Sequence, residues 1–93
     1  MHNHIYPMLK EYGLKENEIK IYLYLVGKNR LTAYKIAKEL KINRSTCYDT
    51  LNRLISKGFV SKRVVENKDY YLSKEINSVL SQLKSKEIIL KSL

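Results

Sequence analysis

The sequence predicts a mainly α-helical domain that carries one small β-hairpin. Apolar residues recur at helical spacing along most of the chain, whereas residues 59–65 are rich in β-branched side chains and precede a polar segment and a second strand-like run. With 44% hydrophobic residues, three Gly and one Pro, the composition is that of a folded chain. Its 93 residues fit one small domain, residues 1–93.

Two helices are expected in the first part of the chain. Pro7 suits the first turn of a short N-terminal helix within residues 1–12, and Gly13 ends it. Between Gly13 and Gly27, apolar residues recur every three to five positions, which predicts a second helix. Glu18 lies in the first turn of that helix, where the positive end of the helix dipole favours a carboxylate.

The next two helices have clear capping signals. Thr32 is placed to cap a helix over residues 33–40, and Asn43 is placed to cap a helix over residues 44–57. Gly58 should end the latter helix. The connection between the two helices is only three residues long. We therefore expect a pair of helices joined by a tight turn.

A β-hairpin is expected over residues 59–73. Its strands are residues 59–65 and 70–73, joined by a polar turn over residues 66–69. Tyr70 and Tyr71 alternate along the second strand, so one of them should be buried, and the pattern leaves open which one.

A long final helix is expected over residues 74–93, because apolar residues are spaced there mainly by three, four and seven. Such a helix is longer than the core of so small a domain covers, which favours dimerisation over the alternative that it only caps its own core. The residues expected to mediate dimerisation are Ile76, Val79, Leu80, Leu83, Ile89, Leu90 and Leu93.

This order of elements is typical of a winged helix-turn-helix. Two helices joined by a short turn, the second of them followed by a two-stranded ribbon, define that arrangement. The winged helix-turn-helix core would span residues 13–73, with the N-terminal helix of residues 1–12 before it.

The charge of the chain indicates a polyanionic partner. The net charge is +9, and residues 28–63 carry +8 of it, from ten basic residues against Glu39 and Asp49. Each phosphate that a basic side chain neutralises releases a condensed counterion, so clustered charge favours nucleic acid. The alternative is a highly soluble surface without a specific partner.

The helix over residues 44–57 has two chemically different sides. On a wheel of about 100° per residue, Cys47, Leu51 and Leu54 face the core. The other side carries short hydrogen-bonding groups, which suit base edges in the major groove of DNA. The residues expected to contact bases are Ser45, Thr46, Tyr48, Asp49 and Asn52.

A second set of residues is expected to contact phosphates, which fix the position of the protein on the duplex. This set contains Thr32, Tyr34, Lys35, Arg44, Arg53, Lys57, Lys62, Arg63 and Lys68. Asp49 requires a separate explanation, since a carboxylate is repelled by phosphate. It would either accept a hydrogen bond from a cytosine amino group or, as we prefer, hold Arg53 four positions along the helix.

Other classes of function have little support in the sequence. A single cysteine, Cys47, excludes an internal disulfide, and two His near the N-terminus are too few for a metal site. No nucleophile with a base or pair of carboxylates indicates an enzyme. We expect no cofactor and no small-molecule site, and in the absence of an apolar span we expect a cytoplasmic protein without membrane contact.

Two motifs carry a resemblance to a known family. Their residues are Gly13, Leu14, Glu18, Tyr22 and Leu25, followed by Ile36, Ala37, Ile42, Arg44, Ser45, Tyr48, Leu51, Leu54, Lys57 and Gly58. With these motifs, residues 13–75 resemble the DNA-binding domain of the TrmB-like transcriptional regulators, which are common in archaea. MarR-like domains share the winged fold and parts of the pattern. The resemblance implies a role in transcriptional regulation.

The chain departs from that family in two respects. Lys15 stands where the family usually has Ser or Thr, so the cap of the second helix should be weaker. Many members also carry a large C-terminal sugar-sensing domain, and this chain ends at Leu93, so no effector site is carried over.

Two functions are consistent with these features. The first is a homodimeric transcriptional regulator that binds double-stranded DNA sequence-specifically, with residues 44–57 in the major groove and the wing of residues 59–73 on the flanking backbone or minor groove. The alternative is a winged-helix module that binds proteins or coats DNA without sequence preference.

Overall fold

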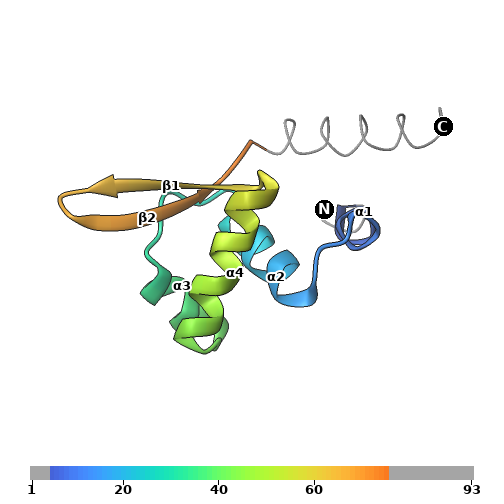
Figure 1. The fold of residues 1–93 in the computed structure, drawn as a ribbon, viewed down its shortest axis with the longest axis horizontal. Helices are drawn as coiled ribbons and strands as arrows, with labels where there is room; N and C mark the ends of the chain where they lie inside the picture. Colours follow the sequence, from blue (N-terminus) through green and yellow to red (C-terminus); the bar gives the residue numbers. More distant parts are fainter. Residues whose placement is uncertain (1–4, 76–93) are drawn as a thin grey trace.

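The computed structural model describes residues 5–75, and this part of the chain contains helices followed by one antiparallel hairpin (Figure 1). The elements are α1 (Ile5–Tyr12), α2 (Glu16–Leu25), α3 (Ala33–Leu40), α4 (Arg44–Lys57), β1 (Val60–Val65) and β2 (Lys68–Ser73). The expected mainly α fold with a small hairpin is confirmed. The C-terminal helix and its dimerisation residues lie outside the described residues.

The first two helices follow from local signals. Gly13 has a φ of 110°, a conformation that a residue with a Cβ adopts only with strain, and it separates α1 from α2. Lys15 precedes α2 in an extended conformation, and its backbone N–H donates to Oε1 of Glu18 at 3.0 Å. The carboxylate thus satisfies one of the free N–H groups at the start of α2.

The helix-turn-helix has the expected boundaries because its caps form. Thr32 Oγ1 accepts a hydrogen bond from the Lys35 N–H at 3.2 Å, and Asn43 Oδ1 accepts one from the Ser45 N–H at 2.9 Å. Lys41 has a φ of 55°, so the chain leaves α3 through a left-handed residue before α4 begins. Gly58, with a φ of 86°, ends α4.

The hairpin turn is tighter than the sequence predicts. Val65 pairs with Lys68 and Val64 pairs with Asp69, so the turn consists of Glu66 and Asn67 alone. These two residues have φ values of 50° and 65°, the left-handed pair that matches the twist of a two-residue hairpin loop. The expected turn over residues 66–69 was wrong because Lys68 and Asp69 belong to β2.

A short bridge joins the loop before α3 to the hairpin. The Leu31 N–H donates to the Tyr71 carbonyl at 2.9 Å, and the Tyr71 N–H donates to the Leu31 carbonyl at 2.7 Å. Tyr71 is buried against the helices, whereas Tyr70 on the other face of β2 is only partly buried. The bridge therefore fixes the loop after α2 beside the base of the wing.

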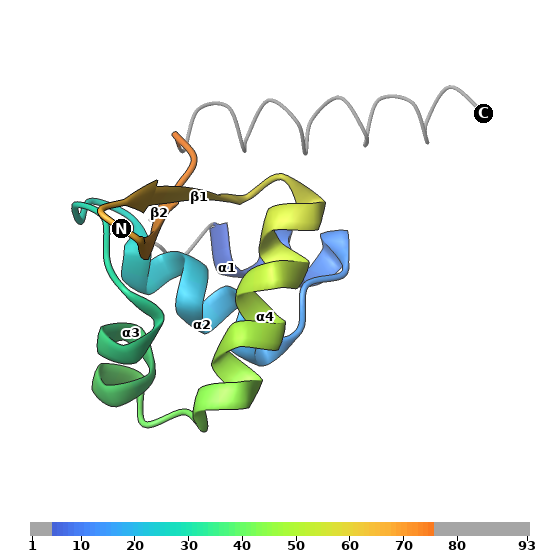
Figure 2. The ribbon, with the colours of Figure 1, turned by 60° about the vertical axis from the view of Figure 1, so that its left-hand side comes forward.

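The core lies between α4 and the elements packed around it, which include α2, α3 and β1 (Figure 2). Phe59 is fully buried, and the rings of Tyr12 and Tyr22 meet it edge to face at 5.5 and 5.8 Å between centroids. Burial raises the pKa of Tyr22 to about 12. These contacts join α1 and α2 to the residue that follows the end of α4.

Candidate nucleic-acid interface

Helix α4 presents one buried and one exposed side, as its sequence predicts. Cys47, Leu51 and Leu54 are fully buried, whereas the expected base-contacting residues lie mostly in solvent. Among these, Ser45, Tyr48, Asp49 and Asn52 are exposed and Thr46 is half-buried. The side chains that could meet base edges are therefore on the accessible side of α4.

Ser45 is already part of a local hydrogen-bond network. Its hydroxyl donates to Asn43 Oδ1 at 2.7 Å, and the same oxygen accepts from the backbone N–H of Ser45. The Ser45 Oγ retains lone pairs, so without rearrangement it offers an acceptor rather than a donor. An amino group on a base edge, such as that of cytosine or adenine, would suit it.

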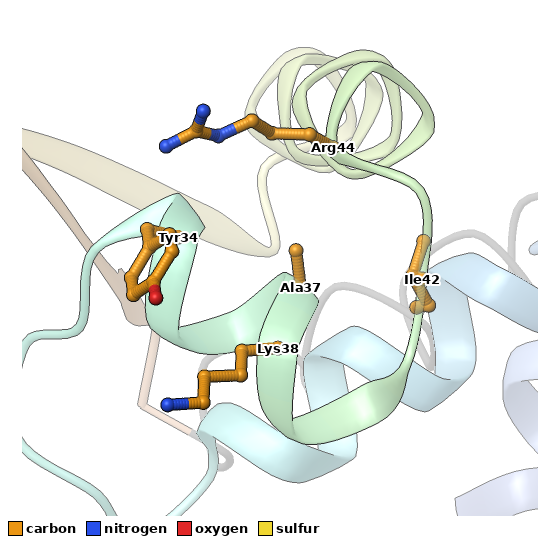
Figure 3. Close-up of a pocket in the computed structure, with 5 residues that line it drawn as sticks. All are labelled: Tyr34, Ala37, Lys38, Ile42 and Arg44. Carbon is orange, nitrogen blue, oxygen red and sulfur yellow. The ribbon is translucent and has the colours of Figure 1, made fainter.

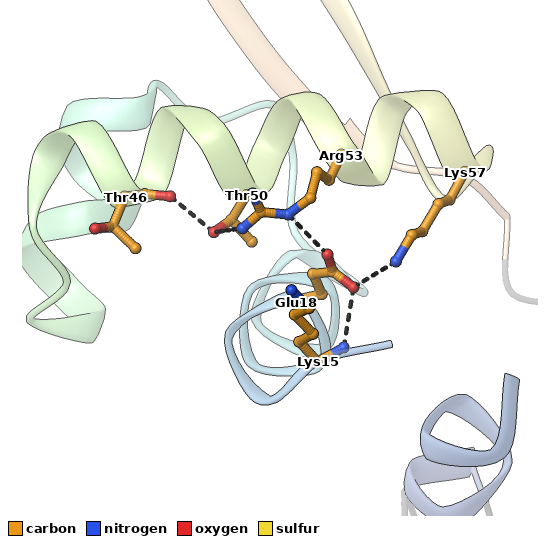
Figure 4. Close-up of polar contacts among 6 residues, drawn as sticks. All are labelled: Lys15, Glu18, Thr46, Thr50, Arg53 and Lys57. Atoms are coloured by element: carbon orange, nitrogen blue, oxygen red, sulfur yellow. Dashed lines mark hydrogen bonds and ion pairs between the residues drawn. The ribbon is translucent and has the colours of Figure 1, made fainter. Parts of the chain in front are cut away.

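A buried carboxylate connects α2 to α4 (Figure 4). The Glu18 side chain is fully buried, and it accepts hydrogen bonds from Arg53 Nε at 3.0 Å and from Lys57 Nζ at 2.8 Å. Arg53 also donates to Thr50 Oγ1 at 3.4 Å. Two cations of α4 are thus held by one carboxylate of the neighbouring helix.

The charges around Glu18 outweigh the cost of its burial. Burial alone raises the pKa of this carboxyl, but hydrogen bonds from Lys57, from the Lys15 backbone N–H and from Arg53 lower the pKa below its usual value. Glu18 is therefore ionised at neutral pH and paired with both cations.

This network gives two residues of α4 a structural role that the sequence did not indicate. Arg53 and Lys57, which are expected from the sequence to contact phosphates, are both paired with Glu18. Arg53 donates to Glu18 and Thr50 rather than to Asp49. Among the described residues, the structure therefore shows no contact by which Asp49 would hold Arg53, the role that we preferred for it. Asp49 is exposed, and acceptance from a cytosine amino group is the role that stays as a prediction.

One side of α3 and the start of α4 together form a cationic hollow (Figure 3). The ring of Tyr34 is flanked by the guanidinium of Arg44, 5.5 Å from its centroid, and by the ammonium of Lys38 at 6.0 Å. Ala37 and Ile42 complete the lining of a hollow of about 250 Å³. Cations at these distances from an exposed aromatic ring are attracted to its face, which orders them for an anion.

Lys38 was missed as a candidate in the sequence. It lies four residues after Tyr34 and therefore on the same side of α3, a spacing that would have identified it. Tyr34 and Arg44 were both assigned to phosphates, and the structure brings these two residues together. Lys35 is also exposed at the start of this helix.

The cations of the wing point in different directions. Lys62, Arg63 and Lys68 are all exposed. Lys62 lies 3.8 Å from Asp69, a distance at which an exposed pair contributes little stability and leaves the ammonium accessible. Arg63 pairs across the hairpin with Tyr70, and cross-strand partners share a face, so it projects from the opposite side of the wing.

Alternative sites have no support among residues 5–75. This part of the chain contains no group of three or more His, Cys, Asp or Glu residues that could hold a metal ion, and none of its helices is long and apolar enough to cross a membrane. The Cys47 thiol is buried against the Ala33 carbonyl at 3.7 Å, and burial raises its pKa, which makes it a poor nucleophile.

Comparison with known proteins agrees with this geometry. Residues 9–75 match the family described as sugar-specific transcriptional regulator TrmB. The chain belongs to the TrmB family. The family consists of winged-helix transcriptional regulators and not of enzymes, which confirms both the resemblance and the expectation of a non-enzymatic DNA-binding domain. Among curated proteins, none matches the chain.

Solved structures show the same fold at low identity. The ST1889 protein from Sulfolobus tokodaii is similar over 92% of this chain and 91% of its own, with 20% identity and a TM-score of 0.75. Sco5413, a MarR family regulator from Streptomyces coelicolor, is similar over 92% of this chain with 18% identity and a TM-score of 0.68. The matched region covers 62% of the length of Sco5413.

The cationic hollow gives a first testable prediction for this TrmB domain. We expect Lys38→Gln to weaken binding to all duplexes alike and to lower the slope of log K against log salt concentration by about 1 per bound protomer, because each protomer loses one phosphate contact. Fluorescence anisotropy over a range of salt concentrations measures this slope. Lys20→Gln removes the same charge from an exposed position of α2 and should leave the slope unchanged. Equal slopes for both variants would contradict the assignment.

Proposed function

We propose that this TrmB-family domain binds double-stranded DNA sequence-specifically, with α4 in the major groove. The observation that carries the proposal is the exposed side of α4, which is lined by short hydrogen-bonding side chains while its other side is fully buried. Groups of this kind discriminate between base pairs in the major groove, whereas a surface for solubility alone needs only long charged residues.

Phosphate contacts would position α4 on the duplex. Tyr34, Lys38 and Arg44 form one group at the junction of α3 and α4, and Thr32 and Lys35 lie at the start of α3. The wing would reach the flanking backbone or minor groove, with Lys62 and Lys68 exposed along it. Arg53 and Lys57 would set the angle of α4 through Glu18 rather than bind phosphate.

The protein would act as a homodimer through the apolar residues expected in 76–93, a region outside the described residues. A dimer with two-fold symmetry presents two α4 helices to successive major grooves, so its site would be an inverted repeat with half-sites about 10 bp apart or a small multiple of that distance.

Enrichment of the full chain on random duplex oligonucleotides, at a stated salt concentration, tests the proposal. We expect a consensus with two related half-sites. A pool that shows binding without enrichment of any sequence would instead identify a module that coats DNA non-specifically.

A further inference from the structure

A second basic hollow lies at the base of the wing, away from α4. It has a volume of about 430 Å³ and is lined by Lys28, Asn29, Arg30, Arg63, Leu72 and Ser73. Three of these side chains are cationic and exposed, and no carboxylate lines the hollow. Lys28 and Arg30 come from the loop after α2, which the bridge between Leu31 and Tyr71 holds against the hairpin.

The register of the hairpin places this hollow on the opposite face from the one that packs on α4. Tyr71 is buried on the inner face, where its phenol lies near Cys47 and Tyr48 of α4. Tyr70 and its partner Arg63 belong to the other face, because successive residues of a strand alternate. A straight duplex seated on α4 would therefore not fill this hollow.

The cations of the hollow are ordered by aromatic rings rather than by acidic partners. The Arg30 guanidinium lies 4.7 Å from the ring centroid of Tyr70, and the Lys28 ammonium lies 4.3 Å from that of Tyr24. Within residues 5–75, none of Lys28, Arg30 and Arg63 forms an ion pair. The charges of Lys28 and Arg30 are thus held in place by aromatic rings, and the exposed Arg63 adds a third charge that is available to an anion.

The exposure of these groups decides which kind of anion fits. A free phosphate gains little from exposed cations, because water screens each interaction. A phosphodiester backbone gains entropy from every counterion released, which does not require a buried site. Arginine also matches phosphate oxygens with paired N–H donors, and the Ser73 hydroxyl adds a further donor.

We infer that Lys28, Arg30 and Arg63 form a second phosphodiester-binding site, separate from the interface on α4. The polyanion is either the flank of the same duplex bent around the wing or a second duplex. This inference goes beyond the proposed function, since the site would bind DNA even if α4 selected no sequence.

The test compares two double variants with equal loss of charge. Arg30→Gln with Arg63→Gln removes cations from the hollow, and Lys10→Gln with Lys20→Gln removes two exposed cations of α1 and α2. On a random duplex of about four helical turns, we expect the first variant to lower the salt slope by about 2 per bound protomer and the second to leave it unchanged. The Arg63→Gln change in the hairpin could impair folding, whereas Lys28→Gln changes only the loop after α2. We expect Lys28→Gln to lower the salt slope by about 1 per bound protomer.

Duplex length separates the two sources of phosphate. If one bent duplex fills both sites, the two double variants should have the same salt slope on a duplex of about one turn, because no flank is present there. If a second duplex binds, light scattering at low salt should find two short duplexes per protomer, and one after the Arg30 and Arg63 substitutions.

Equal slopes and stoichiometries for the two double variants would overturn the inference. Asn52→Ala should remove base preference at one position of each half-site without altering these slopes, so the two proposals fail independently.

Discussion

Replacing Glu18 with Gln should lower the free energy of unfolding by about 2 kcal/mol at neutral pH. The Glu18 side chain is fully buried and accepts hydrogen bonds from Arg53 and Lys57, and Gln removes the charge while keeping the shape. Hydrogen bonds to charged groups contribute about 1.5–3 kcal/mol each. The loss stays below the sum because the Arg53 and Lys57 side chains are 46% and 33% exposed and regain water.

The same substitution should change how stability depends on pH. The pKa of Glu18 is lower in the folded chain than in an unfolded one, so its stabilising contribution is complete above the unfolded value of about 4.3 and is lost as pH falls through the folded value. The difference in stability between wild type and Glu18→Gln should therefore be largest near pH 7 and should shrink below about pH 4.

Urea unfolding followed by circular dichroism at several pH values measures the free energy of unfolding and its dependence on pH. In a thermal melt at neutral pH, the melting temperature of the variant should fall by roughly 8–16 °C for a domain of this size. Glu11→Gln removes the same charge at an exposed position of α1 and should cause no comparable loss. Parallel curves of stability against pH for wild type and Glu18→Gln would show that the ion pairs contribute nothing.

The same variant also separates two roles for the cations of α4. If Arg53 and Lys57 serve only to hold α4 against α2, their release in Glu18→Gln adds free charge near the duplex and should make the salt dependence of DNA binding steeper. If both already bind phosphates, as the sequence alone indicated, the salt slope of the variant should equal that of wild type.

The boundaries of the helix-turn-helix were predictable because local signals determine them. Thr32, Asn43 and Gly58 cap their helices with their own side chains or backbone, so the residues that decide each boundary lie within one turn of it. The exposed side of α4 was predictable for the same reason, since its period of 3.6 residues sorts core from solvent. The two-residue hairpin turn was not, because Glu66 is an unusual residue for a left-handed position.

The Glu18 network could not be derived from local pattern. Glu18 is separated from Arg53 by 35 residues and from Lys57 by 39, and its position in the first turn of α2 already had a local explanation in the helix dipole. Asp49, four residues from Arg53, offered a nearer partner. Only the crossing of α2 and α4 decides between the two carboxylates, and that crossing depends on how the whole core packs.

Replacing Asn52 with Ala should abolish base preference at one position of each half-site. Asn52 is exposed on α4, and its amide can both donate to and accept from the edge of an adenine. A well-formed pair of this kind is worth about 1–3 kcal/mol of discrimination, so the ratio of specific to random-duplex affinity should fall roughly 5- to 150-fold for each half-site. Competition between the enriched site and a random duplex at one salt concentration measures this ratio.

Two controls make the loss of specificity interpretable. Asn17→Ala deletes the same amide from an exposed position of α2 and should leave the ratio unchanged. Lys38→Gln should weaken specific and random binding by the same factor, because a phosphate contact carries no sequence information. An unchanged ratio for Asn52→Ala would exclude Asn52 from base recognition. If Tyr48→Phe were also without effect, the exposed side of α4 would not be the surface that selects sequence, however tightly the protein bound DNA.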